Sequence, residues 1–265
     1  ADTYYRKALN YRNLYYPDYG FMWAKDANGK WRDAFDATEW GGPFTEGSSW
    51  HWTWSVLHDP EGLSRLMGGH TAMEARLDSM FVVPNTYNYG TYGFVIHEIA
   101  EMVALNMGQY AHGNQPVQHA IYLYDYIGQP WKTQYHLRNV MDKLYNSGSK
   151  GYCGDEDNGQ TSAWYVFSAM GFYPVCPGTD QYVLGAPYLP YLKLTLPNGK
   201  TLEIKAPGVS DKKRYVQSLK LNGESYDKMY ITHEDILKGG VLEFKMSASP
   251  NKRRGVSVSY THLRA

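Results

Sequence analysis

Residues 161–174, TSAWYVFSAMGFYP, mark the point at which the chain changes from helical to strand patterns. Thr161 to Met170 form a helical pattern that ends before Gly171, a residue type that commonly follows the last turn of a helix. After Pro174, apolar residues alternate with polar ones at a spacing of two, as they do in a strand. We therefore predict an α+β protein with helices before this stretch and strands after it.

On the N-terminal side, helical patterns alternate with loops marked by Gly and Pro. One helix is expected within residues 93–108, GFVIHEIAEMVALNMG, and another at 131–145. The residues expected on one apolar stripe of the first are Ile96, Ile99, Val103 and Met107, with Gly108 as its stop. At the start of the chain, one face of a further helix is expected to carry Tyr5, Ala8, Leu9 and Tyr15.

On the C-terminal side, residues 191–196 and 201–205 alternate on either side of the turn sequence PNGK at 197–200, which predicts a hairpin. Further strands are expected at 216–221 and 241–246, so this part is predicted to be a small antiparallel β region. The predicted domains are a helical part at 1–174 and a strand part at 175–255. Residues 258–265 leave the strand pattern and match, in one reading frame, a translated transposase-adapter sequence, so we expect a sequencing or translation artefact at 256–265.

The bulk composition favours a neutral ligand. Net charge is +0, which removes the electrostatic reason to expect nucleic acid or an anionic membrane as a partner, and no apolar run approaches the roughly 20 residues of a membrane span. Cys153 and Cys176 could pair, but two free thiols are expected. The 25 Tyr and 8 Trp suit sugar rings, which stack on aromatic faces, although a Tyr-rich core explains them equally well.

A first candidate site is the loop 41–54, GGPFTEGSSWHWTW, in which Glu46 stands before three tryptophans. Apolar aromatic surroundings disfavour the ionised form of a carboxyl group, which is how glycosidases keep an acid protonated near neutrality. Ser48 or Ser49 is a possible helix N-cap. The simpler alternative is that Glu46 merely caps the following helix, and this segment alone favours that alternative.

A second candidate site is the loop 151–159, GYCGDEDNG. If the loop is extended, Asp155 and Asp157 point to one side and Glu156 to the other. Two close carboxylates can activate a water molecule or bind a hard cation such as Ca²⁺. A solvated acidic turn is an equally good alternative.

Two further segments carry polar groups next to helix starts. His97 and Glu98 lie in TYGFVIHEI, and because adjacent residues diverge on a helix, we expect them to contact different groups of one ligand rather than each other. A zinc site of the HExxH type is excluded because position 101 is Glu. The other segment is the loop HGNQPVQH at 112–119.

Taken together and in order, these segments resemble glycoside hydrolase family 92 over about residues 4–255. The matching stretches are TEWGGPFTEGSSWHWTWSVLHD, TYGFVIHEI, YAHGNQP, YDYIGQPWKTQ, GYCGDEDNGQTSAWYVFSAMGFYPVCPG, YVLGAP and ITHEDILKGG. The resemblance implies a Ca²⁺-dependent, inverting exo-α-mannosidase in which an N-terminal β-sandwich and an (α/α)₆ toroid share the active site. The chain would then supply the second half of the toroid followed by the small antiparallel β region.

By the same resemblance, Glu46 corresponds to the general acid, and Asp155 and Asp157 correspond to the residues that activate water. His97 and Glu98 would contact the mannose and favour α-1,2 linkages. The implied partners are a mannose-containing glycan and the missing N-terminal β-sandwich of the same polypeptide. The implied location is secreted or periplasmic in a bacterium, and the fragment alone is expected to be inactive.

The resemblance also implies a calcium ion, for which Asn114 and Glu98 are the candidate ligands, and Trp50 is expected to contact the sugar. Gln115 departs from the family, whose members commonly have Glu there; the lost charge could weaken cation binding, shift substrate preference or have no effect. Two alternatives of other kinds are a carbohydrate-binding protein without activity and a different (α/α)₆ glycosidase, such as a glucoamylase-like enzyme. The acidic residues argue against the first, and the His97–Glu98 pair together with ITHEDILKGG argues against the second.

Overall fold

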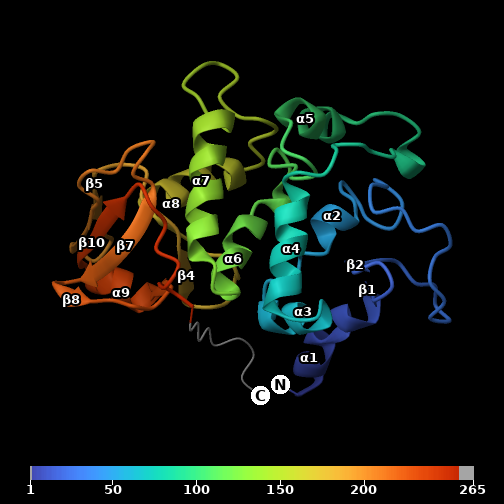
Figure 1. The fold of residues 1–265 in the computed structure, drawn as a ribbon, viewed down its shortest axis with the longest axis horizontal. Helices are drawn as coiled ribbons and strands as arrows, with labels where there is room; N and C mark the ends of the chain where they lie inside the picture. Colours follow the sequence, from blue (N-terminus) through green and yellow to red (C-terminus); the bar gives the residue numbers. More distant parts are fainter. Residues whose placement is uncertain (1, 257–265) are drawn as a thin grey trace. The chain divides into compact units, whose positions relative to one another are not determined.

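The structure is a computed structural model that describes residues 2–256 (Figure 1). The chain divides into two compact units, residues 2–120 with 148–155 and residues 121–147 with 156–256. The helices of 121–170 thus gather with the C-terminal strands, which differs from the predicted division at 174. All but the first residue of the predicted artefact, 256–265, lie outside the described part. Within that part, no helix has the length and apolar character needed to cross a bilayer.

The first unit consists of short helices joined by long loops. Its elements are α1 (Asp2–Ala8), η1 (Asn10–Leu14), β1 (Tyr15–Tyr16), β2 (Phe21–Met22), α2 (Ser49–Trp52), α3 (Pro60–Leu66), α4 (His70–Met80), η2 (Gly90–Tyr92), α5 (His97–Leu105) and η3 (Gln115–Val117). Strands β1 and β2 form a small antiparallel pair. Residues Met73, Leu77 and Met80, spaced by four and three, are fully buried on α4, so this helix forms one side of the unit's core.

Helix α2 is held in place by a capping box. The side chain of Ser48 accepts a hydrogen bond from the backbone N–H of Trp50, which confirms the predicted cap. His51 completes the box, because its Nδ1 accepts from the backbone N–H of Ser48 at 2.9 Å, and its Nε2 contacts the carbonyl of Gln109 at 2.9 Å. The cap and the buried imidazole fix the direction in which the loop of Glu46 enters the helix.

Helix α5 confirms the predicted helix but not its predicted apolar stripe. Its buried residues are Ile99 and Met102, whereas Val103 is 37% exposed. The helix ends at Leu105 because Asn106 adopts a left-handed conformation with φ 50°, before Gly108 is reached. Positions three and four residues after Ile99 both lie near its side of the helix, so packing rather than spacing decides that Met102 is buried and Val103 is not.

The predicted helical face at the start of the chain is wrong. Helix α1 ends at Ala8, and the chain continues as the tighter η1, so the α-helical spacing is lost after two turns. Tyr5 and Leu9 are exposed, and α1 has no buried residue. Tyr15 is buried, but in β1.

The second unit contains the remaining helices and two sheets. Its elements are η4 (Ala120–Tyr122), which begins one residue earlier, α6 (Leu123–Tyr126), α7 (Pro130–Leu144), α8 (Gln160–Met170), β3 (Phe172–Tyr173), β4 (Gln181–Leu184), β5 (Tyr191–Thr195), β6 (Thr201–Lys205), β7 (Tyr215–Leu221), β8 (Glu224–Ser225), β9 (Tyr230–Thr232), α9 (His233–Lys238) and β10 (Gly240–Ser247). The helices expected at 131–145 and 161–170 are confirmed as α7 and α8. The half-toroid arrangement stays a prediction.

The five-stranded sheet has the order β5-β6-β10-β7-β8. The hairpin β5–β6 is antiparallel as predicted, with Thr195 opposite Thr201. The predicted antiparallel β region is confirmed for the other pairs of this sheet, but strand β10 runs parallel to β6, a pairing that the sequence did not predict. Helix α9 returns the chain between β9 and β10, and β10 then enters between β6 and β7, an order that residue alternation does not encode.

One face of this sheet carries the core of the second unit. Leu202, Ile204, Leu242 and Phe244 are all buried there, at positions that alternate along β6 and β10. Helix α7 lies beside β7 (Figure 1), where the side chain of Gln134 accepts a hydrogen bond from the backbone N–H of Val216 at 2.9 Å. The helix therefore belongs with the sheet structurally.

Candidate active site

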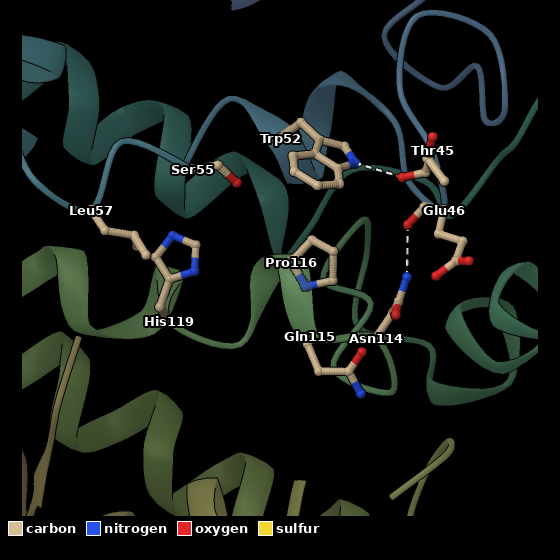
Figure 2. Close-up of a pocket in the computed structure, with 9 residues that line it drawn as sticks. All are labelled: Thr45, Glu46, Trp52, Ser55, Leu57, Asn114, Gln115, Pro116 and His119. Atoms are coloured by element: carbon tan, nitrogen blue, oxygen red, sulfur yellow. Dashed lines mark hydrogen bonds between the residues drawn. The ribbon is translucent and has the colours of Figure 1, made fainter. Parts of the chain in front are cut away.

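A pocket of about 460 Å³ opens in the first unit beside Glu46 (Figure 2). The loop before α2, the start of α2, the segment after it and the loop at η3 contribute its walls. The lining residues are Thr45, Glu46, Trp52, Ser55, Leu57, Asn114, Gln115, Pro116 and His119. The loops around Glu46 and Asn114, which lie far apart in the sequence, therefore meet at one site.

Glu46 has no capping role. Ser48 and His51 form the cap of α2, so the simpler alternative for Glu46 is wrong. Its carboxylate makes no hydrogen bond or ion pair with any residue in 2–256, and the residue is exposed rather than enclosed by aromatic rings. The loop geometry is unusual: Glu46 has a φ of 48°, and its side chain points away from Trp52 (Figure 2). Glu46 thus lines the pocket with a carboxylate that no described residue engages.

The tryptophans near Glu46 have different surroundings. Trp50, the expected sugar contact, is only 8% exposed and packs edge-on against Phe21, with ring centroids 4.8 Å apart. Trp52 lines the pocket instead, and its Nε1 donates a hydrogen bond to the carbonyl of Thr45 at 2.9 Å. Helical geometry explains the difference, because residues two apart point to different sides of α2.

Acidic side chains surround His97 at the start of α5. Its Nε2 is 3.3 Å from Glu98 Oε1 and 3.9 Å from Asp155 Oδ2, and its Nδ1 is 3.2 Å from Glu101 Oε1. The hydrogen bond with Glu101 is the main cause that raises the pKa of His97. The expectation that His97 and Glu98 do not contact each other is therefore wrong: the first residue of a helix has no preceding turn, so its ring can bend toward its neighbour.

Glu101 is a site residue that the sequence did not single out. Its Oε1 binds His97, while its Oε2 is buried and has no hydrogen-bond partner within the described residues. Burial is the main cause that raises the pKa of this carboxyl group, and it outweighs the opposing effect of His97. The signal that could have identified it is its position four residues after His97, on the same side of α5.

Glu101 also lies where two loops touch. A Cβ atom added to Gly113 would lie 3.0 Å from Glu101 Oε2 and 2.8 Å from the carbonyl oxygen of Cys153. A Cβ added to Gly154 would lie 2.7 Å from Glu101 Oε2 and 2.5 Å from the carbonyl oxygen of Gly113. Only glycine permits this approach. The loops that carry Asn114 and Asp155 therefore meet over the Glu101 carboxylate.

The acidic loop does not have the extended form that the sequence suggested. Asp157, Asn158 and Gly159 form a turn with φ values of 53°, 56° and 97°. The middle acid, Glu156, serves α8: its carboxylate accepts hydrogen bonds from the backbone N–H of Gly159 at 2.7 Å and of Ser162 at 3.2 Å. Because the loop turns, the alternation of an extended strand does not determine whether Asp155 and Asp157 point to the same side.

The histidines near the pocket are neutral. Burial lowers the pKa of His119 to about 4, of His51 to about 4 and of His112 to about 3. His119 lines the pocket, and its Nε2 lies 2.8 Å from the carbonyl of Trp54. These rings shape the pocket without adding charge to it.

The candidate calcium ligands lie in different surroundings. Across residues 2–256, no group of at least three His, Cys, Asp or Glu side chains is arranged to hold a metal ion. Asn114 donates through Nδ2 to the carbonyl of Glu46 at 2.7 Å, so its Oδ1 is the atom left for a ligand. Glu98 is engaged with His97. Both cysteines are free thiols.

Comparison with known proteins adds relatives from one family. The chain is similar to a solved family GH92 inverting mannosidase from Bacteroides thetaiotaomicron VPI-5482, with 73% identity and a TM-score of 0.85 over 97% of this chain and 35% of that one. It is also similar to a family GH92 α-mannosidase from Bacteroides thetaiotaomicron, solved with mannoimidazole, with 36% identity and a TM-score of 0.85 over 95% of this chain and 33% of that one.

A more distant relative is described as an uncharacterized secreted glycosidase of Arthroderma benhamiae, 28% identical over 76% of this chain and 23% of that protein. The chain therefore spans about a third or less of the length of these relatives. The family model for the glycosyl hydrolase family 92 catalytic domain matches residues 1–248, nearly the whole chain. This protein belongs to glycosyl hydrolase family 92.

Proposed function

We propose that this chain is the C-terminal part of a calcium-dependent, inverting exo-α-mannosidase that releases terminal mannose, with a preference for α-1,2 linkages, from mannose-containing glycans. The observation that carries the proposal is the 73% identity, over 97% of the chain, with a family GH92 inverting mannosidase. The pocket lined by Glu46 is the place where we propose that the reaction occurs.

In this proposal Glu46 is the general acid. Glu46 lines the pocket, and its carboxylate has no partner among the described residues, so it can give its proton to the glycosidic oxygen as the bond to the leaving sugar breaks. Asp155 and Asp157 are the candidates for the base, which takes a proton from water as that water attacks the opposite face of the anomeric carbon. Inverting enzymes hold acid and base roughly 6.5–9.5 Å apart to leave room for this water.

His97 and Glu98 are proposed to bind the mannose. The side chain of His97 is 59% exposed and that of Glu98 is 14% exposed, so the imidazole can meet a sugar hydroxyl directly. The acidic neighbours of His97 favour its protonated form, which is a hydrogen-bond donor through both nitrogens. Such a donor suits a sugar oxygen.

Calcium is proposed because the oxygen atoms present fit a hard cation. The buried Oε2 of Glu101 has no partner in the described residues and lies against Gly113, next to Asn114, whose Oδ1 is available. Water and sugar hydroxyls would complete the six to eight oxygen ligands that calcium takes. When bound, the ion would supply positive charge and a template for the sugar hydroxyls.

The chain is proposed to act within a longer polypeptide that supplies an N-terminal β-sandwich and the rest of the toroid. The support is that the two solved relatives are about three times as long as the region they share with it. A secreted or periplasmic location in a bacterium is proposed from the bacterial relatives and the secreted glycosidase of Arthroderma benhamiae.

The test uses the complete protein, recovered by extending the coding sequence beyond this chain, with α-1,2-mannobiose as substrate. We expect turnover that a calcium chelator abolishes and added Ca²⁺ restores, and nuclear magnetic resonance should detect β-mannose as the first product. Glu46→Gln should lower kcat by about 10² or more, the usual range for loss of an acid catalyst. Glu224→Gln, an exposed residue of the second unit, is the matched control. Turnover that survives both Glu46→Gln and the chelator would contradict the proposal.

A further inference from the structure

Glu46 has an unusual backbone conformation. Its φ of 48° lies in the left-handed region, which a residue with a side chain rarely adopts. Such a conformation is strained and persists only where the surroundings fix it. The contacts around this one residue therefore decide where its carboxyl group points.

Side chains hold the Glu46 backbone from both directions. Its N–H donates a hydrogen bond to the hydroxyl oxygen of Tyr92 at 2.9 Å, and its carbonyl accepts one from Asn114 Nδ2 at 2.7 Å (Figure 2 shows the second). The carbonyl of the preceding residue, Thr45, accepts from Trp52 Nε1 at 2.9 Å. The N–H of Glu46 and the carbonyl of Thr45 belong to one peptide group, so Tyr92 and Trp52 hold its two sides, and its orientation relative to the Glu46 Cα sets φ.

Tyr92 is itself fixed by its ring. A Cβ atom added to Gly41 would lie 2.4 Å from Tyr92 Cε2, so the ring lies flush against the glycine backbone. Gly41 also has a φ of 66°, which glycine adopts without strain. Since a locked ring gives its hydroxyl a defined position, Tyr92 can serve as a rigid acceptor.

Tyr92 also connects the two parts of the proposed site. It is the last residue of η2, and α5 with His97 and Glu98 begins five residues later. The loop of Glu46 is therefore tied to the segment that leads directly to the proposed sugar contacts.

We infer that Tyr92 is a positioning residue for acid catalysis, holding Glu46 in its left-handed conformation so that the carboxyl group faces the glycosidic oxygen; this inference rests on the proposed function. Without the hydroxyl, the Glu46 backbone relaxes toward negative φ and the carboxyl group leaves the line of proton transfer. Binding of the sugar ring does not use this contact, so the effect belongs to kcat.

The experiment compares Tyr92→Phe with the unchanged complete protein on two substrates. α-1,2-Mannobiose needs a proton on its leaving oxygen, whereas 2,4-dinitrophenyl α-mannoside releases a stable phenolate without one. We expect Tyr92→Phe to lower kcat on mannobiose by about 10- to 100-fold, the range for a displaced catalytic group, with little change in KM. On the dinitrophenyl substrate the change should stay below about twofold, since acid catalysis contributes little there.

Tyr89→Phe is the matched control, because Tyr89 is 43% exposed and precedes the same short helix. Tyr89→Phe should leave kcat unchanged on both substrates. Gly41→Ala is a second variant that forces the Tyr92 ring to move and should reproduce the difference between the substrates.

Equal losses on both substrates, or no loss on mannobiose, would overturn the role of Tyr92 while leaving the proposed function in place. The proposed function fails in a different way: the unchanged protein would not hydrolyse mannobiose, or Glu46→Gln would keep full turnover on it. In that case the positioning role is overturned as well.

Discussion

His51 can hold the start of α2 only in its neutral form. Its Nδ1 accepts the N–H of Ser48, so the ring proton is on Nε2, which donates to the carbonyl of Gln109. Protonation of Nδ1 would replace an acceptor with a donor and break the capping box. Because the ring is buried, its pKa falls to about 4, which keeps it neutral at physiological pH.

The buried imidazole makes the stability of the first unit depend on pH. Its folded pKa of about 4 lies below its ordinary value of 6.5, so the unfolded chain binds protons first as the pH falls. The contribution of His51 to the free energy of unfolding is complete above pH 6.5. It is lost as the pH falls from 6.5 to about 4, and the loss amounts to about 3 kcal/mol. Urea unfolding across this window should show a shallower decline for His51→Gln than for the unchanged chain. An unchanged slope would contradict the assignment.

Gln115 offers a test of the proposed calcium site. It lines the pocket beside Asn114, and its buried Nε2 has no partner in the described structure. Gln115→Glu replaces that donor with a charged oxygen, and added ligand charge raises calcium affinity. We expect the Ca²⁺ concentration for half-maximal turnover of the complete protein to fall by about tenfold. Asn28→Asp, the same charge change at an exposed loop, should leave it unchanged; a rise for Gln115→Glu would argue against calcium here.

Helix α8 depends on an acid that precedes it. The side chain of Ser162 and the backbone N–H groups of Gly159 and Ser162 donate to Glu156 and lower its pKa from its ordinary value of 4.5. This contribution is present above the unfolded pKa and is lost as the pH falls through the folded one. Glu156→Gln should therefore speed hydrogen exchange at the Gly159 and Ser162 amides at neutral pH. Asp157→Asn should not speed exchange at these amides. Equal acceleration by both variants would contradict a specific role for the Glu156 carboxylate at the start of α8.

Strand β10 is the central strand of the five-stranded sheet, and its inward residues should dominate the stability of the second unit. Leu242 is fully buried between its neighbours on β6 and β7, opposite Ile204 and Leu221. Leu242→Ala should lower the free energy of unfolding by about 2–5 kcal/mol, as measured by urea denaturation. Lys245→Ala, on the exposed face of the same strand, should change it by less than about 0.5 kcal/mol. Similar losses for the two variants would contradict the observed face.

The local sequence was sufficient to predict those elements whose hydrogen bonds join residues close together in the chain. The hairpin β5–β6 follows from alternation on both sides of a Pro-Asn-Gly-Lys turn, and α8 follows from its helical spacing and the glycine after it. The buried side of α5 was not predictable, because Met102 and Val103 are both apolar and only packing decides between them. The parallel pairing of β10 with β6 likewise joins residues about 40 positions apart.

The chain as a whole exposes large apolar side chains, which include Tyr4 at 77%, Val82 at 79% and Phe94 at 64%. If it acts within a longer enzyme, some of this surface is covered there. The chain alone is expected to show no turnover of α-1,2-mannobiose and to bind a hydrophobic fluorescent dye more strongly, per mole, than the complete protein. Turnover by the chain alone would show that its pocket needs no further domain.

The candidate catalytic and binding residues stay predictions from the sequence, whereas their arrangement could come only from the structure. Glu46, Asp155 and His97 occur in segments whose order is typical of the family. Glu101 escaped notice because a carboxylate on an amphipathic helix has no distinctive local pattern. Trp52 lines the pocket in place of the predicted Trp50 because of which side of the four-residue helix α2 faces the core, and the sequence does not show this.

Sequence determined the family, the acidic segments and the change from helices to strands after Pro174, because these properties lie in residue type and short-range spacing. Tertiary structure decided that Ser48 and His51, not Glu46, cap α2, that the Oε2 atom of Glu101 lies buried against Gly113 and Gly154, and that Tyr92 accepts the backbone N–H of Glu46. Each of these depends on contacts between segments separated in the chain, or on burial, which residue spacing does not specify.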